Sequence, residues 1–317
     1  MKIQKIYELA IKEGMKADPR DKEELDKFLE KSKKEYENLK DDEKEFFDLE
    51  KLTNPYSDTR ILAGDPNTDV STILCGVDIE VGEVLLADRL REKGKNIDLL
   101  LAHHPEGKSL AGLPGVMRVQ ADIWHREGVP INIGEFLIDE RMKEVQRSVM
   151  PVNHNRAVDA AKLLGIPFMN VHTPADNMVT SFLQKGFDEV PPYTVKDVIS
   201  FLRKIPEYNM AAKTGTGPTI LVGDGDKRAG RVVVDMTGGT EGPEEVLEKL
   251  ANAGVGTIVG MHMGSKLRKK ALKYHINVVI AGHIASDNLG LNLLLDNLEK
   301  EGIEIIECSG FTRISRL

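Results

Sequence analysis

Short apolar runs alternate with stretches of helical periodicity over most of this chain, from about residue 60 to the end. Such alternation is typical of a mostly parallel or mixed sheet that is covered by helices. The apolar fraction of 41% in 317 residues is sufficient for a real core. We therefore expect an α/β fold with two layered α/β domains and mixed sheets. The expected strands lie at 72–77, 97–102, 130–133, 219–222, 231–235, 256–259 and 276–281.

A charged segment precedes this region and carries side chains of both signs. Ile3, Ile6 and Leu9 fall at helical spacing, which predicts amphipathic helices. Asp18 is a candidate N-cap for a second helix, with Pro19 at its first helical position. A solvated helical face is the favoured interpretation of this segment, and a docking arm for a partner subunit is the alternative.

Breaks between two halves of the chain are expected at stretches rich in glycine and proline, because such stretches favour turns. The best candidates are 186–193 and 214–230, and we place the boundary near residue 186. This division gives a charged helical segment at 1–54, a first α/β domain at 55–185 and a second α/β domain at 186–317.

Charge and cysteine content argue against several classes of protein. The net charge of -8 is the opposite of the basic surplus that nucleic acid-binding proteins usually carry. The two cysteines, Cys75 and Cys308, are too few for a cysteine zinc site. Neither a signal peptide nor a membrane-spanning stretch is recognised, so we expect a cytoplasmic protein without a membrane partner.

The sharpest local signal is a pair of adjacent histidines at the end of an apolar strand. His103 and His104 directly follow the run 98–102, and Pro105 ends it. Strand ends of this kind are favoured places for a site. Because neighbouring side chains of a strand point to opposite faces, the pair can serve one centre only if the backbone turns, or if each ring binds a different metal. Two loop histidines satisfied by backbone hydrogen bonds are the alternative.

Two further segments place a carboxylate close to a strand exit. His283 and Asp287 lie four residues apart, a spacing that lets both side chains reach one ion if the segment is helical. An ordinary helix start explains them equally well. Asp176 follows the apolar run 166–171, where a turn or cap is the common role of aspartate. Histidine and carboxylate ligands suit divalent transition metals, and a carboxylate can bridge two such ions.

From about residue 55 to the C-terminus, the sequence resembles the Nif-three-like family, which is named for NGG-one-interacting factor three and is also described as dinuclear-metal-centre hexamer proteins. The motifs that carry the resemblance occur in the family's order along the chain. They are NPYSDTRILAGDP (54–66), CGVDIE (75–80), AHHP (102–105), HTPAD (172–176) and GHIASD (282–287).

The resemblance implies two neighbouring divalent metal ions, with Zn, Mn, Fe, Co or Ni as candidates. The implied ligands are His103, His104, Asp176, His283 and Asp287. The family has Glu at the last position, and the shorter Asp287 predicts weaker binding, binding through water, or a helix that lies closer. The resemblance also implies a homo-oligomer, commonly a ring-shaped hexamer, and suggests a relation to GTP cyclohydrolase type I.

Two more residues are candidates for proton transfer during catalysis. Glu106 follows the histidine pair, although an exposed loop position explains it as well, and His262 lies at another strand exit. Because water held between two metal ions loses a proton near neutral pH, we hypothesise a metal-dependent hydrolase that acts on a phosphorylated or nucleotide-like small molecule. An iron or zinc carrier, or a regulatory interaction protein without catalysis, is the alternative.

Weaker signals complete the sequence-based expectations. The segment 237–243 joins a strand to a helix and is a candidate anion site, although its glutamates would repel an anion. The segment 213–217 is interpreted as a hairpin turn and not as a phosphate loop. His154 and His172 are candidates to orient metal ligands through their second nitrogens.

Overall fold

The computed structural model describes residues 1–317 and contains two mixed β-sheets. The five-stranded sheet has the order β1 (Arg60–Ala63), β4 (Phe168–Asn170), β3 (Leu99–Ala102), β2 (Thr72–Gly76) and β9 (Glu304–Glu307). The four-stranded sheet has the order β5 (Thr219–Val222), β8 (Asn277–Ile280), β7 (Val255–Gly260) and β6 (Arg231–Asp235). In each sheet one edge strand, β1 or β5, is antiparallel and the other pairs are parallel. The predicted α/β fold with mixed sheets is confirmed.

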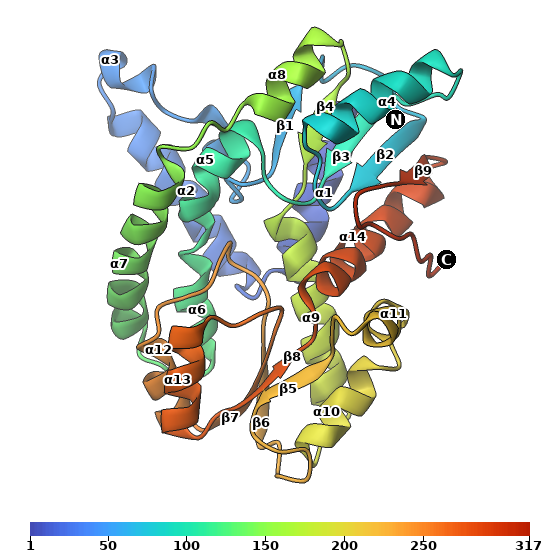
Figure 1. Cartoon of the computed structure of the whole chain (residues 1–317). Coiled ribbons are helices and arrows are strands. Elements are labelled where there is room, and N and C mark those ends of the chain that lie inside the picture. Colours follow the sequence, from blue (N-terminus) through green and yellow to red (C-terminus); the bar gives the residue numbers. More distant parts are fainter.

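Three helices connect the two sheets: α1 (Ile3–Ala17), α9 (Thr173–Glu189) and α14 (His283–Lys300). Figure 1 shows α9 and α14 crossing the middle of the molecule between the two sheets. Helix α9 packs along both α1 and α14 and also contacts β6. One apolar core therefore joins α1 and α14 to the five-stranded sheet, and a second joins α9 to the four-stranded sheet.

The remaining helices cover the outer faces of the sheets or lie beside them (Figure 1). They are α2 (Lys22–Asn38), α3 (Asp41–Lys44), the 3-10 turn η1 (Leu49–Leu52), α4 (Val81–Glu92), α5 (Gly107–Val116), α6 (Val119–Arg126), α7 (Ile131–Val149), α8 (Arg156–Leu163), α10 (Val195–Leu202), α11 (Pro206–Thr214), α12 (Val246–Asn252) and α13 (Ser265–Tyr274). None of the helices has the length and apolar composition needed to cross a bilayer.

The charged N-terminal segment is not simply a solvated face. Helix α1 buries Ile3, Ile6 and other apolar side chains in the core, whereas α2 buries little. The predicted cap of the second helix is wrong by three residues, because α2 begins at Lys22 and Asp21 forms its capping box. Asp18 accepts two side-chain hydrogen bonds from Arg20. Helix α1 is therefore part of the fold and not a detached arm.

The predicted boundary near residue 186 does not separate the two sheets. Helix α9 runs through this position to Glu189, and its buried side chains continue to Phe187. The C-terminal strand β9 pairs with β2, so the chain returns to the five-stranded sheet after completing the other one. Strand β9 was not predicted, because it has only four residues and is partly exposed, so its sequence shows little of the apolar periodicity that identifies a strand.

Two local predictions are also corrected. The run 130–133, expected as a strand, instead starts helix α7: Pro130 is the N-cap and 131–133 are the first helical residues. The helix-forming residues that favour this structure, such as Glu135, Leu137 and Glu140, come only after the run. The segment 213–217 is not a hairpin turn, since it ends helix α11. Gly215 caps that helix with a left-handed φ of 76°, a conformation that favours glycine.

Candidate metal centre

Histidines reach the space between the two sheets from three chain segments. His103 and His104 follow β3, and His172 follows the neighbouring parallel strand β4. Parallel strands end at the same edge of a sheet, so these three rings come together. His283 is the first residue of α14, which arrives from the other sheet after β8. The predicted helical relation of His283 and Asp287 is therefore present in the structure.

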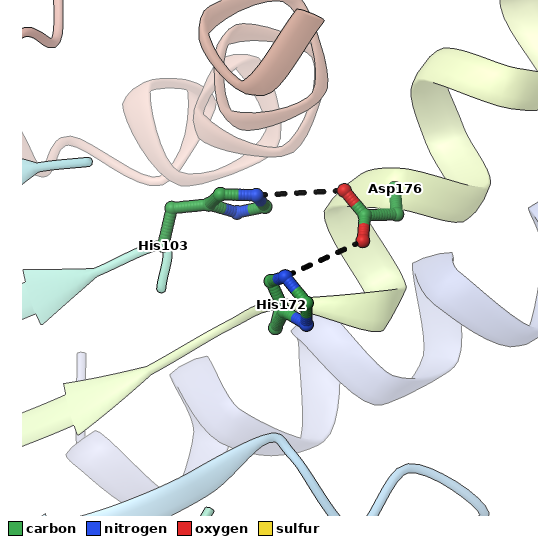
Figure 2. Close-up of side chains that lie close together, drawn as sticks. All are labelled: His103, His172 and Asp176. Atoms are coloured by element: carbon green, nitrogen blue, oxygen red, sulfur yellow. Dashed lines mark ion pairs between the residues drawn. The ribbon is translucent and has the colours of Figure 1, made fainter. Parts of the chain in front are cut away.

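The first cluster of ligand atoms lies around Asp176, in the first turn of α9. Figure 2 shows His103 and His172 pointing toward its two carboxylate oxygens from adjacent strand ends. His103 Nε2 lies 3.4 Å from Asp176 Oδ1, and His172 Nε2 lies 3.7 Å from Asp176 Oδ2. All three residues are buried. This arrangement brings two imidazoles and one carboxylate within reach of a single ion.

The second cluster lies around Asp287, one turn into α14. Its Oδ1 is 3.4 Å from His103 Nε2, and its Oδ2 is 3.5 Å from His104 Nε2 and 3.7 Å from His283 Nε2. The two adjacent histidines thus contact opposite oxygens of one carboxylate. His103 contacts both Asp176 and Asp287, so the two clusters share a side chain and adjoin each other. The five residues predicted from sequence are brought together here.

Buried carboxylate oxygens without partners indicate that a cation fits this place. Asp176 Oδ1 and both oxygens of Asp287 are buried and accept no hydrogen bond. Buried polar atoms are normally paired, and histidine with carboxylate is a suitable donor set for divalent transition metals. Burial alone would raise the pKa of Asp287, but the neighbouring histidines outweigh it and hold this pKa well below its usual range. Asp287 and Asp176 likewise hold the pKa of His103 well above its usual range.

Each ring at the five-stranded sheet is oriented by a hydrogen bond from its Nδ1. The acceptors are Val171 O for His103, at 3.0 Å, Asp78 Oδ1 for His104, at 2.7 Å, and Asp58 Oδ2 for His172, at 2.8 Å. When Nδ1 carries the proton and donates it in this hydrogen bond, Nε2 is unprotonated and its lone pair points toward the carboxylates. In this tautomer Nε2 can bind a metal.

Sequence reasoning assigned no role to Asp58 or Asp78 and considered His172 only as an orienting residue. The structure places His172 Nε2 beside Asp176, so His172 is itself a candidate ligand. Asp58 and Asp78 lie within 54–66 and 75–80, two of the segments that carry the family resemblance. Their position in these segments is the one sequence feature that could have marked them as site residues. His154 Nε2 donates to Val149 O, and His154 orients no ligand.

Replacing Asp78 with asparagine should lower metal affinity by about 10- to 100-fold, the usual effect of removing a carboxylate that orients a metal-binding histidine. The amide keeps the shape but loses the negative charge that His104 Nδ1–H faces at 2.7 Å. Competition with a fluorescent chelator measures the affinity. Asp42→Asn, at an exposed position of α3, is the matched control. Equal affinity in both variants would contradict the assigned role of Asp78.

A cavity of about 340 Å³ opens onto the two carboxylates. Its far wall comes from the ends of β6 and β7 and includes Asp235, Met236 and His262. His262 Nδ1 lies 3.0 Å from Glu241 Oε1, and its ring centroid is 5.0 Å from that of His283. The predicted strand-exit residue His262 therefore faces the candidate metal centre.

The two other loop predictions have different outcomes. Glu106 does not line the cavity, and it is the N-cap residue of α5. Burial, together with the charge of Glu80, raises the pKa of Glu106 to about 7. The segment 237–243 lines the cavity in part, but α12 begins only at Val246 and has seven residues. Glu241, which accepts from Gly264 N and contacts His262, makes this segment acidic and unsuited to an anion.

Comparisons with known proteins give one informative similarity. No family model and no curated protein matches the chain. A crystal structure described as a NIF3 superfamily protein from Sphaerobacter thermophilus is 27% identical, with a TM-score of 0.72 over 82% of this chain and 94% of that one. Reduced HcgD from Methanocaldococcus jannaschii is 14% identical, with a TM-score of 0.49 over 78% of this chain and 87% of that one. A Bacillus cereus protein related to NIF3 is 11% identical, with a TM-score of 0.42 over 82% and 91% of the two chains.

Proposed function

Because the chain belongs to the NIF3 superfamily and brings its histidines and aspartates together beside a cavity, we propose that it is a metal-dependent hydrolase of a small molecule. Two divalent ions are proposed, with Zn, Mn, Fe, Co or Ni as candidates. The proposed substrate is a phosphorylated or nucleotide-like compound that presents a phosphoryl or carbonyl oxygen to the ions.

The observation that carries this proposal is the cavity at the buried, unpartnered carboxylates. Its volume of about 340 Å³ suits a small molecule that reaches the ligands directly. A metal carrier would instead need ligands that a protein partner can approach. His103, Asp176 and Asp287 are at most 4% exposed, which favours retention of the metal over its transfer.

Two ligand sets would hold the ions. His103, His172 and Asp176 form one set, and His104, His283 and Asp287 form the other. Asp287 also faces His103 through its second oxygen, so its carboxylate is placed to bridge the sets. When bound, such ions lower the pKa of water and polarise the oxygen of the bond to be cleaved.

His262 is the proposed residue for proton transfer. Glu241 accepts a hydrogen bond from Nδ1 of His262, which orients the ring. The other ring nitrogen, Nε2, is then left to exchange a proton with the leaving group. The hydrogen bond to Glu241 outweighs burial and raises the pKa of His262 above its usual value. This shift favours the protonated ring, in which Nε2 carries a proton that it can donate. Glu106 lies outside the cavity lining, so this role rests on His262 alone.

The test begins with protein purified without a histidine tag. Elemental analysis should find about two ions per chain, the number that a bridged pair requires. Hydrolysis of a panel of phosphate esters and nucleotides should disappear on chelation and return with Mn, Zn, Fe or Co. His262→Gln should retain the metal but lower kcat by about 10²- to 10⁴-fold, as expected for loss of a general acid.

Two results would overturn the hydrolase. One is turnover that is unchanged after all metal has been removed. The other is metal-loaded protein that turns over no substrate and releases its ions readily to a competing chelator, which would favour the carrier.

Self-association into a homohexamer is also proposed, as the family resemblance implied. Large apolar side chains are exposed on two helices that pack on each other, Leu85 on α4 and Leu163 on α8, and a further one, Phe136, is exposed on α7. Exposed apolar side chains are typical of protein interfaces when they form contiguous patches. The mass of the particle in solution, measured by light scattering, distinguishes a hexamer from a monomer.

A further inference from the structure

Asp235 is a cavity-lining carboxylate that the metal centre does not use. It ends strand β6 and is paired in register with Gly260 of β7, which has no side chain to cover it. Protein atoms surround the carboxyl group, yet it remains accessible to solvent through the cavity. No protein group hydrogen-bonds to it, and it forms no ion pair.

The other acidic side chains of the cavity are already engaged. Asp176 and Asp287 face the histidines, and Glu241 contacts His262 Nδ1 and Gly264 N. None of the residues that line the cavity is a lysine or an arginine. Histidines are therefore the only protein groups in the cavity that could carry a positive charge, and none of them pairs with Asp235, so its carboxylate is free to contact a ligand.

The cavity that holds Asp235 also has an apolar part, rich in methionine. Met236, Met261, Met263 and Ile258 line the same cavity. Methionine side chains adapt to flat surfaces and make favourable sulfur contacts with aromatic rings. An apolar, planar body could thus pack on the methionines of the cavity that Asp235 shares with the His–Asp cluster.

We infer that Asp235 binds a planar nitrogen group with paired N–H donors, of the amidine or guanidine type, on the small molecule that enters this cavity. Two parallel N–H donors match the two oxygens of a carboxylate, and such charge-assisted pairs are strong and directional. Burial, with an added contribution from Glu241, raises the pKa of Asp235 to about 6, which a positively charged partner would reverse. The inference deepens the proposed function by naming the substrate end that lies away from the ions, but the Asp235 contact itself requires no metal.

Benzamidine is the probe, and acetophenone, of similar shape but without N–H donors, is its matched reference. Titration calorimetry on the full chain should show benzamidine binding at least about tenfold more tightly, which corresponds to about 1.4 kcal/mol. Asp235→Asn should reduce this preference to about twofold or less while leaving metal content unchanged. Glu241→Gln should keep the preference, because Glu241 is already engaged by His262 and Gly264.

A second measurement does not depend on any variant. Methyl-labelled methionine NMR of the wild type should show benzamidine shifting Met236, Met261 and Met263, and acetophenone at the same concentration should shift them much less. Equal affinity for the two probes, or a preference that survives in Asp235→Asn, would overturn the inference. Both titrations are repeated on metal-free protein. A retained preference there, together with no metal uptake, would reject the hydrolase and leave the Asp235 site standing.

Discussion

Replacing Asp287 with alanine should remove most of the bound metal, with affinity falling by more than about 100-fold, beyond the effect of losing an orienting partner. This carboxylate contacts three histidines, His103, His104 and His283, and both of its oxygens lack other partners. Its loss should therefore impair both ligand sets. Elemental analysis after dialysis measures the metal content per chain.

The same substitution should remove the stabilisation that metal binding provides. A ligand at 1,000 times its Kd adds about 4 kcal/mol, which raises Tm by roughly 6 °C for a chain of this size. Calorimetric scans with and without excess metal should show this increase for the wild type and not for Asp287→Ala. Asp296→Ala, on the same helix but away from the cavity, is the control for metal content. Full metal occupancy in Asp287→Ala would contradict the assigned centre.

Metal-free protein gives a second readout of the same residue. Asp287 has a lowered pKa in the fold, so its contribution is present above its usual value of 3.8 and is lost as pH falls. His103 has a raised pKa, so its contribution is present below 6.5 and is lost as pH rises through the folded value. The cluster should therefore stabilise the metal-free wild type most between about pH 4 and 6.5, and Asp287→Ala should lose this maximum.

Local spacing was sufficient to predict much of the candidate centre. The four-residue interval between His283 and Asp287 identifies one face of a helix, and α14 begins at His283. For the adjacent histidines, the sequence left two possibilities, a backbone turn or two metals. The amides of His103 and His104 both donate to Val77 O where β3 ends, and the two rings contact different oxygens of Asp287.

Long-range pairing could not be predicted in the same way. Strand β9 lies more than 200 residues from its partner β2 in the chain, and its four residues show no clear alternation. The helical spacing of Ile3 and Ile6 predicted an amphipathic first helix, but it did not show that α1 packs against α9 and α14. Asp58 and Asp78 act only through rings that are distant in sequence, so no local spacing marks them. Residues that act across elements require the assembled fold.

The close packing of α14 on α9 explains how a short carboxylate reaches the histidines. A Cβ added at Gly290 would lie 2.5 Å from the carbonyl oxygen of Ala175. Ala175 precedes Asp176, and Gly290 is one turn beyond Asp287, so this contact lies beside both metal-binding carboxylates. Of the three expectations for Asp287, a helix that lies closer is the one that this packing supports.

Gly290→Ala should therefore lower both stability and metal affinity, because α14 must move away from α9. Overpacking of this kind costs about 1–3 kcal/mol, which lowers Tm by several degrees. We expect a loss of roughly tenfold in metal affinity, equivalent to about 1.4 kcal/mol. Gly82→Ala is the matched control, since a Cβ at this position in α4 meets no atom within 4 Å. Its Tm should remain unchanged or rise slightly.

Adding Asp287→Glu separates the position of the helix from general damage to the fold. In the wild-type background the extra methylene crowds a carboxylate that already lies 3.4 Å from His103 Nε2, so metal affinity should fall. In the Gly290→Ala background it spans the widened gap, so the double variant should bind metal more tightly than Gly290→Ala alone. A double-mutant cycle gives this coupling as a free energy, expected at about 1 kcal/mol or more. Strictly additive losses would mean that Gly290 serves only the packing of the two helices, and that the length of residue 287 is not matched to their separation.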